Sequence, residues 1–168
     1  MSTIDPFRTR VQNLDGGTEV GLRGELIYEY SPRVTEVVEY GARADDIFSG
    51  RANPPPEGAR FDFHLEGPIT GPRLKGTVKG VDYIHVRADG RAQLHIHAQI
   101  ATEDGKKIAL AVDGVASAEE GSSVFHLREC VTLTTNHPDL SWLNSLQVWA
   151  VGTFDWSTRD VQLKAFAV

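Results

Sequence analysis

The alternation of apolar and polar residues along much of the chain is the feature that most constrains its fold. In residues 59–67 (ARFDFHLEG), for example, Phe61, Phe63 and Leu65 alternate with polar or charged neighbours. A period of two places the apolar side chains on one face of a β-strand, whereas an amphipathic helix repeats its apolar positions every three or four residues. The pattern therefore predicts antiparallel strands with one buried face and one polar face.

Short turn signals separate these alternating segments. Asp89-Gly90 and Asp104-Gly105 are residue pairs of the kind that close β-hairpins. Strands are expected within residues 18–30, 59–67, 73–80, 81–90, 92–105, 106–114, 122–133, 144–152 and 160–168. Short strands at this regular spacing predict an all-β barrel or sandwich. We expect an antiparallel β-barrel of roughly eight to ten strands, with a cavity for one small apolar or aromatic molecule.

Size, charge and cysteine content narrow the class further. The chain has 168 residues, which fits one domain over residues 1–168. Its formal net charge is −6, without a long run of like charge, so no nucleic-acid partner is expected. Cys130 is the only cysteine, which excludes an internal disulfide and every multi-cysteine metal motif.

Targeting and membrane-spanning segments are not expected either. Residues 1–10 (MSTIDPFRTR) lack the apolar core that a signal peptide requires. No stretch is long and apolar enough to cross a bilayer. Together with the single cysteine, these features lead us to expect a cytoplasmic protein without a membrane partner. A homodimer is expected only because symmetric dimers are common among soluble proteins.

Residues 31–58 interrupt the strand pattern. Ser31 followed by Pro32 resembles the N-terminus of a helix, so we expect a short helix or lid insertion near residues 31–50. The β-branched valines of this segment weaken that interpretation. Three consecutive prolines at 54–56 then force a stiff, extended connection. A long insertion of this kind can be a binding lid or a plain surface excursion, and both stay open.

Several short motifs follow one another between about residues 58 and 168: GPRLKG, GVDY, RADG, TEDGKKI, LRE and SWLN. Their order and spacing resemble the bacterial family called domain of unknown function 3237. The matching positions are Gly71, Pro72, Gly76, Asp82, Asp89, Gly90, Asp104, Gly105, Arg128, Trp142, Leu143 and Asn144. The resemblance implies a calycin-like or allene-oxide-cyclase-like β-barrel with a cavity along its axis and no assigned function.

The chain departs from this family pattern at two positions. Tyr83 stands where the family usually has tryptophan, and His97 stands where many members have arginine. The chemistry of the cavity lining is therefore expected to differ from the commonest form in the family.

Asp82 is the strongest single candidate for a catalytic residue. It shares a predicted strand face with the apolar Ile84 and Val86. A carboxylate buried on such a face is costly unless it is paired, hydrogen-bonded or protonated with a raised pKa. It can serve as a general acid or base in the cavity, or it can cap the turn at the start of its strand, and both interpretations stay open.

His95 and His97 lie one residue apart on the same predicted face of residues 94–100 (LHIHAQI). Such a pair holds a metal in a closed site only with further ligands. Glu103 lies beyond the expected strand end, and His64 helps only if its strand is adjacent. We therefore expect no metal and assign both histidines to catalytic proton transfer in the cavity, with a solvent-facing position as the alternative.

Further candidates come from the remaining polar and aromatic positions. Arg128 is expected to hold a developing anion or to pair with Asp82. Arg60 and His64 are expected to bind substrate, although each can equally face solvent on the barrel wall. The rest of the expected substrate-binding set is Tyr83, Trp142, Asn144 and Trp149. Core packing and turn hydrogen bonds are the alternative roles for this set.

These residues support one leading hypothesis and two alternatives. The leading hypothesis is an isomerase, cyclase or lyase in which Asp82 and the histidines move protons while Arg128 or Arg60 holds an oxyanion. No organic cofactor is expected, and the sequence has no P-loop, dinucleotide-binding fingerprint or nucleophile elbow. The alternatives are a non-catalytic small-molecule carrier and a metal-dependent enzyme that uses the two neighbouring histidines.

Overall fold

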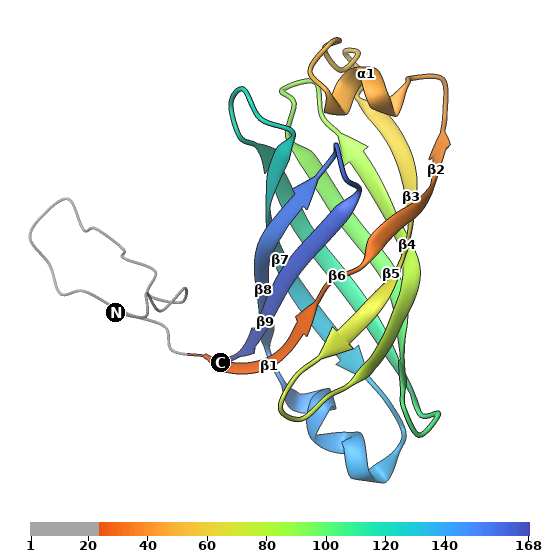
Figure 1. Ribbon diagram of the computed structural model, residues 1–168, viewed down its shortest axis with the longest axis vertical. Coiled ribbons are helices and arrows are strands. Elements are labelled where there is room, and N and C mark those ends of the chain that lie inside the picture. The colour runs from red at the N-terminus through yellow and green to blue at the C-terminus, as the bar shows by residue number, and fades with distance from the viewer. Residues whose placement is uncertain (1–23) are drawn as a thin grey trace, which may run out of the picture.

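The computed structural model describes residues 24–168, which form an antiparallel β-barrel with a short helix near each end (Figure 1). The strands are β1 (Glu25–Tyr30), β2 (Arg33–Glu39), β3 (Ala59–Thr70), β4 (Gly76–Val86), β5 (Ala92–Thr102), β6 (Lys107–Ala118), β7 (Val124–Thr134), β8 (Val148–Asp155) and β9 (Asp160–Ala167). Helix α1 covers Ala44–Phe48, and the 3-10 helix η1 covers Pro138–Ser145. The predicted fold class is confirmed.

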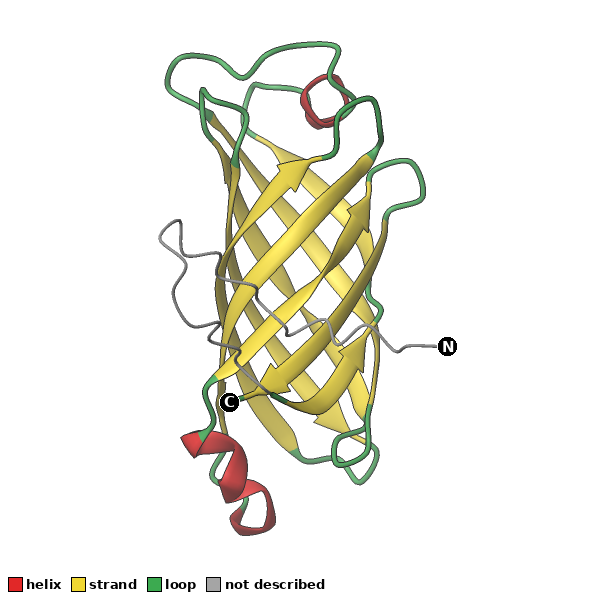
Figure 2. Cartoon of the chain, turned by 90° about the vertical axis from the view of Figure 1, so that its left-hand side faces the viewer, coloured by secondary structure: helices red, strands yellow, loops and turns green. Residues whose placement is uncertain are grey.

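The barrel closes because two short strands share one position in it. Strands β3 to β9 pair in chain order, and β1 and β2 both lie between β3 and β9. Pro32 lies between these two strands, where its missing N–H divides what would otherwise be one strand. The strands are steeply inclined to the barrel axis, as closure requires (Figure 2).

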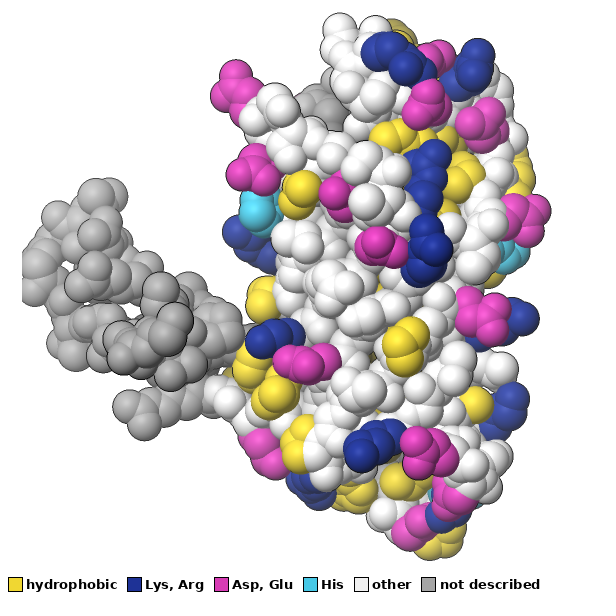
Figure 3. Space-filling model, in the orientation of Figure 1, with side chains coloured by type: hydrophobic (Ala, Val, Ile, Leu, Met, Phe, Trp, Pro, Cys, Tyr) yellow, Lys and Arg dark blue, Asp and Glu magenta, His cyan; other side chains and the backbone are white. Residues whose placement is uncertain are grey.

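The alternation of side chains sorts each strand into a lumenal face and an outer face. In β5, Leu94 and Ile96 are buried, whereas His95 and His97 are exposed. The other strands sort in the same way, so one apolar core runs along the lumen. The outer surface carries acidic and basic side chains intermixed, as the face in Figure 3 shows.

The prediction of a helix that begins at Ser31 is wrong in detail. Residues 33–39 form strand β2, which pairs with β3, because their valines favour an extended backbone and gain a ladder of hydrogen bonds there. The helix within the expected 31–50 insertion is the single turn α1. Its Phe48 is buried against the end of the barrel.

The two predicted hairpin turns are confirmed. Gly90 lies between β4 and β5 and has a φ of 83°, and Gly105 lies between β5 and β6 and has a φ of 84°. Glycine adopts this left-handed backbone without steric cost, whereas other residues do not.

Two expectations lie outside the described residues: the first part of the predicted strand at 18–30, and the lack of a signal peptide in residues 1–10. Across residues 24–168, neither helix has the length and hydropathy that a bilayer span needs.

Candidate active site

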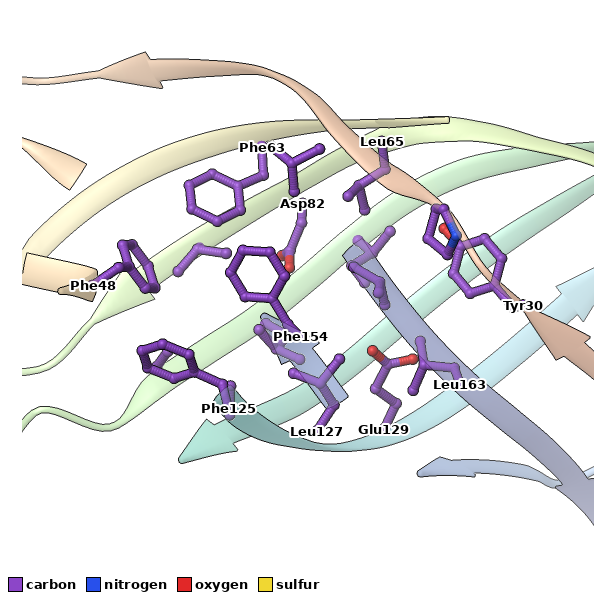
Figure 4. Close-up of a pocket in the computed structure, with 18 residues that line it drawn as sticks. Tyr30, Phe48, Phe63, Leu65, Asp82, Phe125, Leu127, Glu129, Phe154 and Leu163 are labelled. Carbon is purple, nitrogen blue, oxygen red and sulfur yellow. The ribbon is translucent and has the colours of Figure 1, made fainter. Parts of the chain in front are cut away.

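The lumen encloses a cavity of about 40 Å³ that is lined by aromatic and aliphatic side chains (Figure 4). Among the residues that the structure describes, three polar side chains interrupt this lining: Tyr30, Asp82 and Glu129. A volume of this size holds about three water molecules, whereas pockets for drug-sized ligands measure roughly 300–1,000 Å³. A larger ligand therefore requires the lining side chains to move.

Asp82 projects into the lumen from β4 and is only 5% exposed. Its Oδ1 accepts a hydrogen bond from the backbone N–H of His95 at 3.0 Å. Paired residues of β4 and β5 stop at Asp82–Ile96 and resume at His85–Gln93, so this carboxyl replaces a backbone acceptor where the ladder is interrupted. Burial raises the pKa of Asp82 to about 7, although the His95 hydrogen bond opposes the rise.

Glu129 projects into the lumen from β7, on the face it shares with Leu127 and Val131. It is also 5% exposed, and no hydrogen bond to its carboxyl is found within residues 24–168. Burial is the main reason that the pKa of Glu129 rises to about 8, and the negative charge of Asp82 adds to the rise. Glu129 is therefore mostly protonated at neutral pH.

Tyr30, the last residue of β1, supplies a hydroxyl to the same cavity. Its Oη is buried and has no hydrogen-bond partner among the described residues. Burial, and then the charge of Glu129, raise the pKa of Tyr30 well above its usual value, so the phenol stays protonated. An unpaired buried hydroxyl is costly unless a bound molecule or water completes its hydrogen bonds.

The cavity therefore combines one carboxyl that ionises near neutrality with two groups that stay protonated. Asp82 accepts a backbone hydrogen bond that favours its charged form, whereas Glu129 has no such support. A hydrogen bond that favours the charged form of one buried carboxyl suits that carboxyl to act as base and the other to act as acid. The chemistry available is proton abstraction by Asp82, with hydrogen-bond donation from Glu129 and Tyr30.

An aromatic cluster closes the cavity at the α1 end of the barrel. The ring of Phe48 stacks on that of Trp156 at a centroid distance of 5.0 Å and meets Phe63 at 5.2 Å. On its other side lies an open cleft of about 870 Å³, and Phe48, Ala92 and Phe125 line both spaces. The cluster thus lies between the cavity and the cleft.

The structure brings only one of the ten predicted site residues, Asp82, into the lumen. Seven others project from the outer face of the barrel wall: Arg60, His64, Tyr83, His95, His97, Arg128 and Trp149. The expectation that they line the cavity is corrected, because the apolar side chains of the same strands occupy the lumenal face. These side chains instead face away from the lumen, on the outer surface of the barrel.

The remaining two predicted residues lie on η1, beyond the other end of the barrel. The guanidinium of Arg73 lies over the Trp142 ring, with Cζ 3.7 Å from the ring centroid. Asn144 accepts a hydrogen bond from the backbone N–H of Thr135 and donates one to its carbonyl, each at 2.8 Å. Both contacts anchor η1 to the barrel, so the structure places these side chains in structural positions.

Glu129, Tyr30 and Phe48 were missed by sequence reasoning. Glu129 carried the same signal as Asp82, a carboxyl on an apolar strand face between Leu127 and Val131. Alternation along residues 124–133 places Glu129 on this apolar face from the sequence alone. Tyr30 and Phe48 carried no comparable signal, because aromatic residues are common in any core.

Comparisons with known proteins agree with this architecture. The family model described as "Protein of unknown function (DUF3237)" matches residues 52–168. No curated protein matches the chain.

Solved structures share the fold at low sequence identity. A protein of unknown function from Clostridium acetobutylicum ATCC 824 has a TM-score of 0.72 at 19% identity, over 88% of this chain and 99% of that chain. A β-barrel-like protein from Acinetobacter baumannii AYE has a TM-score of 0.67 at 22% identity, over 86% and 94%. A protein described as an enzyme from Penicillium herquei has a TM-score of 0.58 at 21% identity, over 90% and 98%.

Proposed function

The chain belongs to the DUF3237 family of proteins of unknown function, and from that premise we propose that it is an acid/base enzyme of the isomerase or lyase kind. Its substrate is one small apolar or aromatic molecule bound in the lumen, and it needs no organic cofactor. The observation that carries this proposal is the pair of carboxyls, Asp82 and Glu129, buried in an otherwise apolar cavity. Burying two carboxyls costs stability, and active sites are where such a cost is commonly maintained.

The proposed reaction begins with a carbonyl compound whose oxygen faces Glu129 and Tyr30. The Asp82 carboxylate removes a proton from the carbon next to the carbonyl. The electron pair of that C–H bond forms a C=C bond, and the π electron pair of the C=O bond moves onto the oxygen. Hydrogen bonds from the Glu129 carboxyl and the Tyr30 hydroxyl stabilise the resulting enolate. With a β,γ-unsaturated substrate, Asp82 then returns the proton to the γ-carbon and the C=O bond re-forms, which gives the conjugated isomer. With a leaving group on the β-carbon, the C=O bond re-forms, the bond to that group breaks, and the group departs with its electron pair and takes the proton from Asp82, which gives a lyase product.

This assignment changes the residues expected to hold the oxyanion. Arg60 and Arg128 lie on the outer face, so neither reaches a molecule in the lumen. Neutral donors replace them, which favours an uncharged substrate because no cationic side chain among residues 24–168 lines the cavity to pair with an anion. The apolar lining and the aromatic cluster support the same substrate class.

The test is substrate discovery with matched variants. Tag-free protein is incubated with fractionated small-molecule extracts of microbial cultures, and mass spectrometry follows compounds that disappear and products that form. Asp82→Asn should lower turnover by about 100- to 10,000-fold, the usual contribution of a general base. Asp62→Asn is the matched control, because Asp62 lies on the outer face of the neighbouring strand β3.

The outcomes separate the proposal from a carrier function. Conversion by the wild-type protein and by Asp62→Asn, but not by Asp82→Asn, supports the enzyme. Retention of an unchanged compound by all three proteins, without product, supports a carrier and contradicts the proposal. Equal conversion by the wild-type protein and Asp82→Asn rules out the assigned base.

A further inference from the structure

Two imidazoles converge on the outer wall of the barrel, on the side of β5 that faces away from the lumen. The Nε2 atoms of His95 and His97 lie 3.0 Å apart, and the two ring planes meet at 74°. The side chain of His95 is 55% exposed, so a solvated ion can reach this pair. Neither imidazole has a role in the chemistry proposed for the lumen.

Asp113 on β6 orients the first of these rings. His95 and Asp113 are registered partners across β5 and β6, and Nδ1 of His95 lies 2.7 Å from a carboxylate oxygen of Asp113. With the proton on Nδ1 donated to Asp113, the lone pair of Nε2 is directed toward His97. A carboxylate behind a histidine in this manner fixes the tautomer and raises the basicity of the ligating nitrogen.

The separation of the two nitrogens is that of a hydrogen bond, in which Nε2–H of His97 donates to Nε2 of His95 when Nδ1 of His95 is protonated. A metal ion would replace this proton, and the spacing is also compatible with two bonds to one ion. With metal–nitrogen bonds of about 2.0–2.1 Å, nitrogens 3.0 Å apart subtend an angle of about 95° at the metal. Tetrahedral zinc requires about 109°, which would place the nitrogens about 3.3–3.4 Å apart. An angle near 90° is that of the square-planar or tetragonal sites which Cu²⁺ and Ni²⁺ prefer.

We propose that His95 and His97 form a two-imidazole site for one tetragonal divalent cation, Cu²⁺ or Ni²⁺, with Asp113 as the positioning carboxylate. Within residues 24–168 no group of three or more His, Cys, Asp or Glu side chains is arranged to hold a metal, so water fills the remaining positions. The bound ion is therefore open to exchange and to an added ligand. The sequence led us to expect no metal because a third protein ligand is missing. A tetragonal site whose remaining ligands are water molecules does not need one.

The experiment is a titration of the tag-free protein with Cu²⁺ alone, in a buffer that does not coordinate metals. Binding is followed by calorimetry, and electron paramagnetic resonance reports the geometry and the number of bound nitrogens. The variants are His95→Ala, His97→Ala and Asp113→Asn, with His126→Ala as a control because His126 is an exposed histidine elsewhere on the outer wall. His95→Ala keeps the backbone N–H of His95, so the hydrogen bond to the Asp82 carboxyl in the lumen is retained.

We expect one Cu²⁺ per chain with a tetragonal spectrum and coupling to two imidazole nitrogens. His95→Ala and His97→Ala should each weaken binding at least tenfold, Asp113→Asn should weaken it about 10- to 100-fold, and His126→Ala should leave it unchanged. Equal affinity in wild type, His95→Ala and His97→Ala would place the copper elsewhere and overturn the proposal. A tetrahedral spectrum or coupling to a single nitrogen would also overturn it.

Discussion

Replacing Glu129 by glutamine should remove a large pH dependence from the stability of the protein. The carboxyl has a pKa of 4.5 in the unfolded chain and of about 8 when buried in the lumen. Each pKa unit is worth about 1.4 kcal/mol, so the difference amounts to about 5 kcal/mol. Glutamine keeps the shape of the side chain and cannot ionise.

The direction of the effect follows from which state binds more protons. At pH 4 both states are largely protonated, so Glu129 imposes little penalty on the folded state. As the pH rises, the unfolded chain ionises first and is stabilised, and the free energy of unfolding therefore falls until the folded carboxyl ionises near pH 8. Asp82 is present in both proteins, so to first order its contribution cancels from the difference.

The assay is urea unfolding at intervals from pH 4 to pH 9, followed by tryptophan fluorescence. The free energy of unfolding of the wild type, relative to Glu129→Gln, should fall by about 5 kcal/mol over this range. Glu36→Gln, at an exposed position of β2, should follow the wild-type curve. Parallel curves for wild type and Glu129→Gln would refute the reasoning, because they would mean that Glu129 ionises alike in both states.

Four further predictions follow from particular contacts. Phe48→Ala should cost about 3–5 kcal/mol and enlarge the cavity toward the cleft, so that benzene raises the Tm of the variant more than that of the wild type; equal shifts would argue against the plug. Gly152→Ala should cost about 3 kcal/mol or more in urea unfolding, because its Cβ would lie 1.8 Å from the carbonyl oxygen of Gln162, and wild-type stability would contradict that packing. Asn144→Ala should cost about 1–2 kcal/mol by thermal unfolding, because it removes both hydrogen bonds to Thr135, and an unchanged Tm would show that they contribute little. Arg128→Ala should leave turnover of a discovered substrate unchanged, and a large loss would return Arg128 to the site.

The strands and their turns could be predicted from the sequence because both depend on local chemistry. The alternation around Phe61 and Phe63 specifies a strand with two unlike faces, and Asp-Gly pairs specify tight turns. The helix near Ser31 was misplaced because strand pairing with β3 outweighed a local capping signal. That pairing partner is distant in sequence, and local patterns carry no information about it.

The site was harder to predict because the alternation of side chains along a strand defines two faces but does not say which face points into the barrel. On β4 the carboxyl of Asp82 shares its face with Ile84, so burial followed directly. On β5 the histidines were assigned to the cavity, although the apolar Leu94 and Ile96 occupy the lumenal side. Because the cavity is small, apolar side chains fill most of the positions that point into the barrel. The polar residues that alternate with them therefore lie on the outer wall.

The central claim is that the lumen holds two carboxyls whose pKa values are raised by burial, and carbon-13 NMR of labelled aspartate and glutamate side chains tests it most directly. Titration from pH 3 to pH 10, with Asp82→Asn and Glu129→Gln used for assignment, should show Asp82 ionising near pH 7 and Glu129 near pH 8. Removal of Asp82 should lower the titration midpoint of Glu129, because the charge of Asp82 adds to its pKa. Ionisation of both carboxyls below pH 5 would contradict the acid/base assignment.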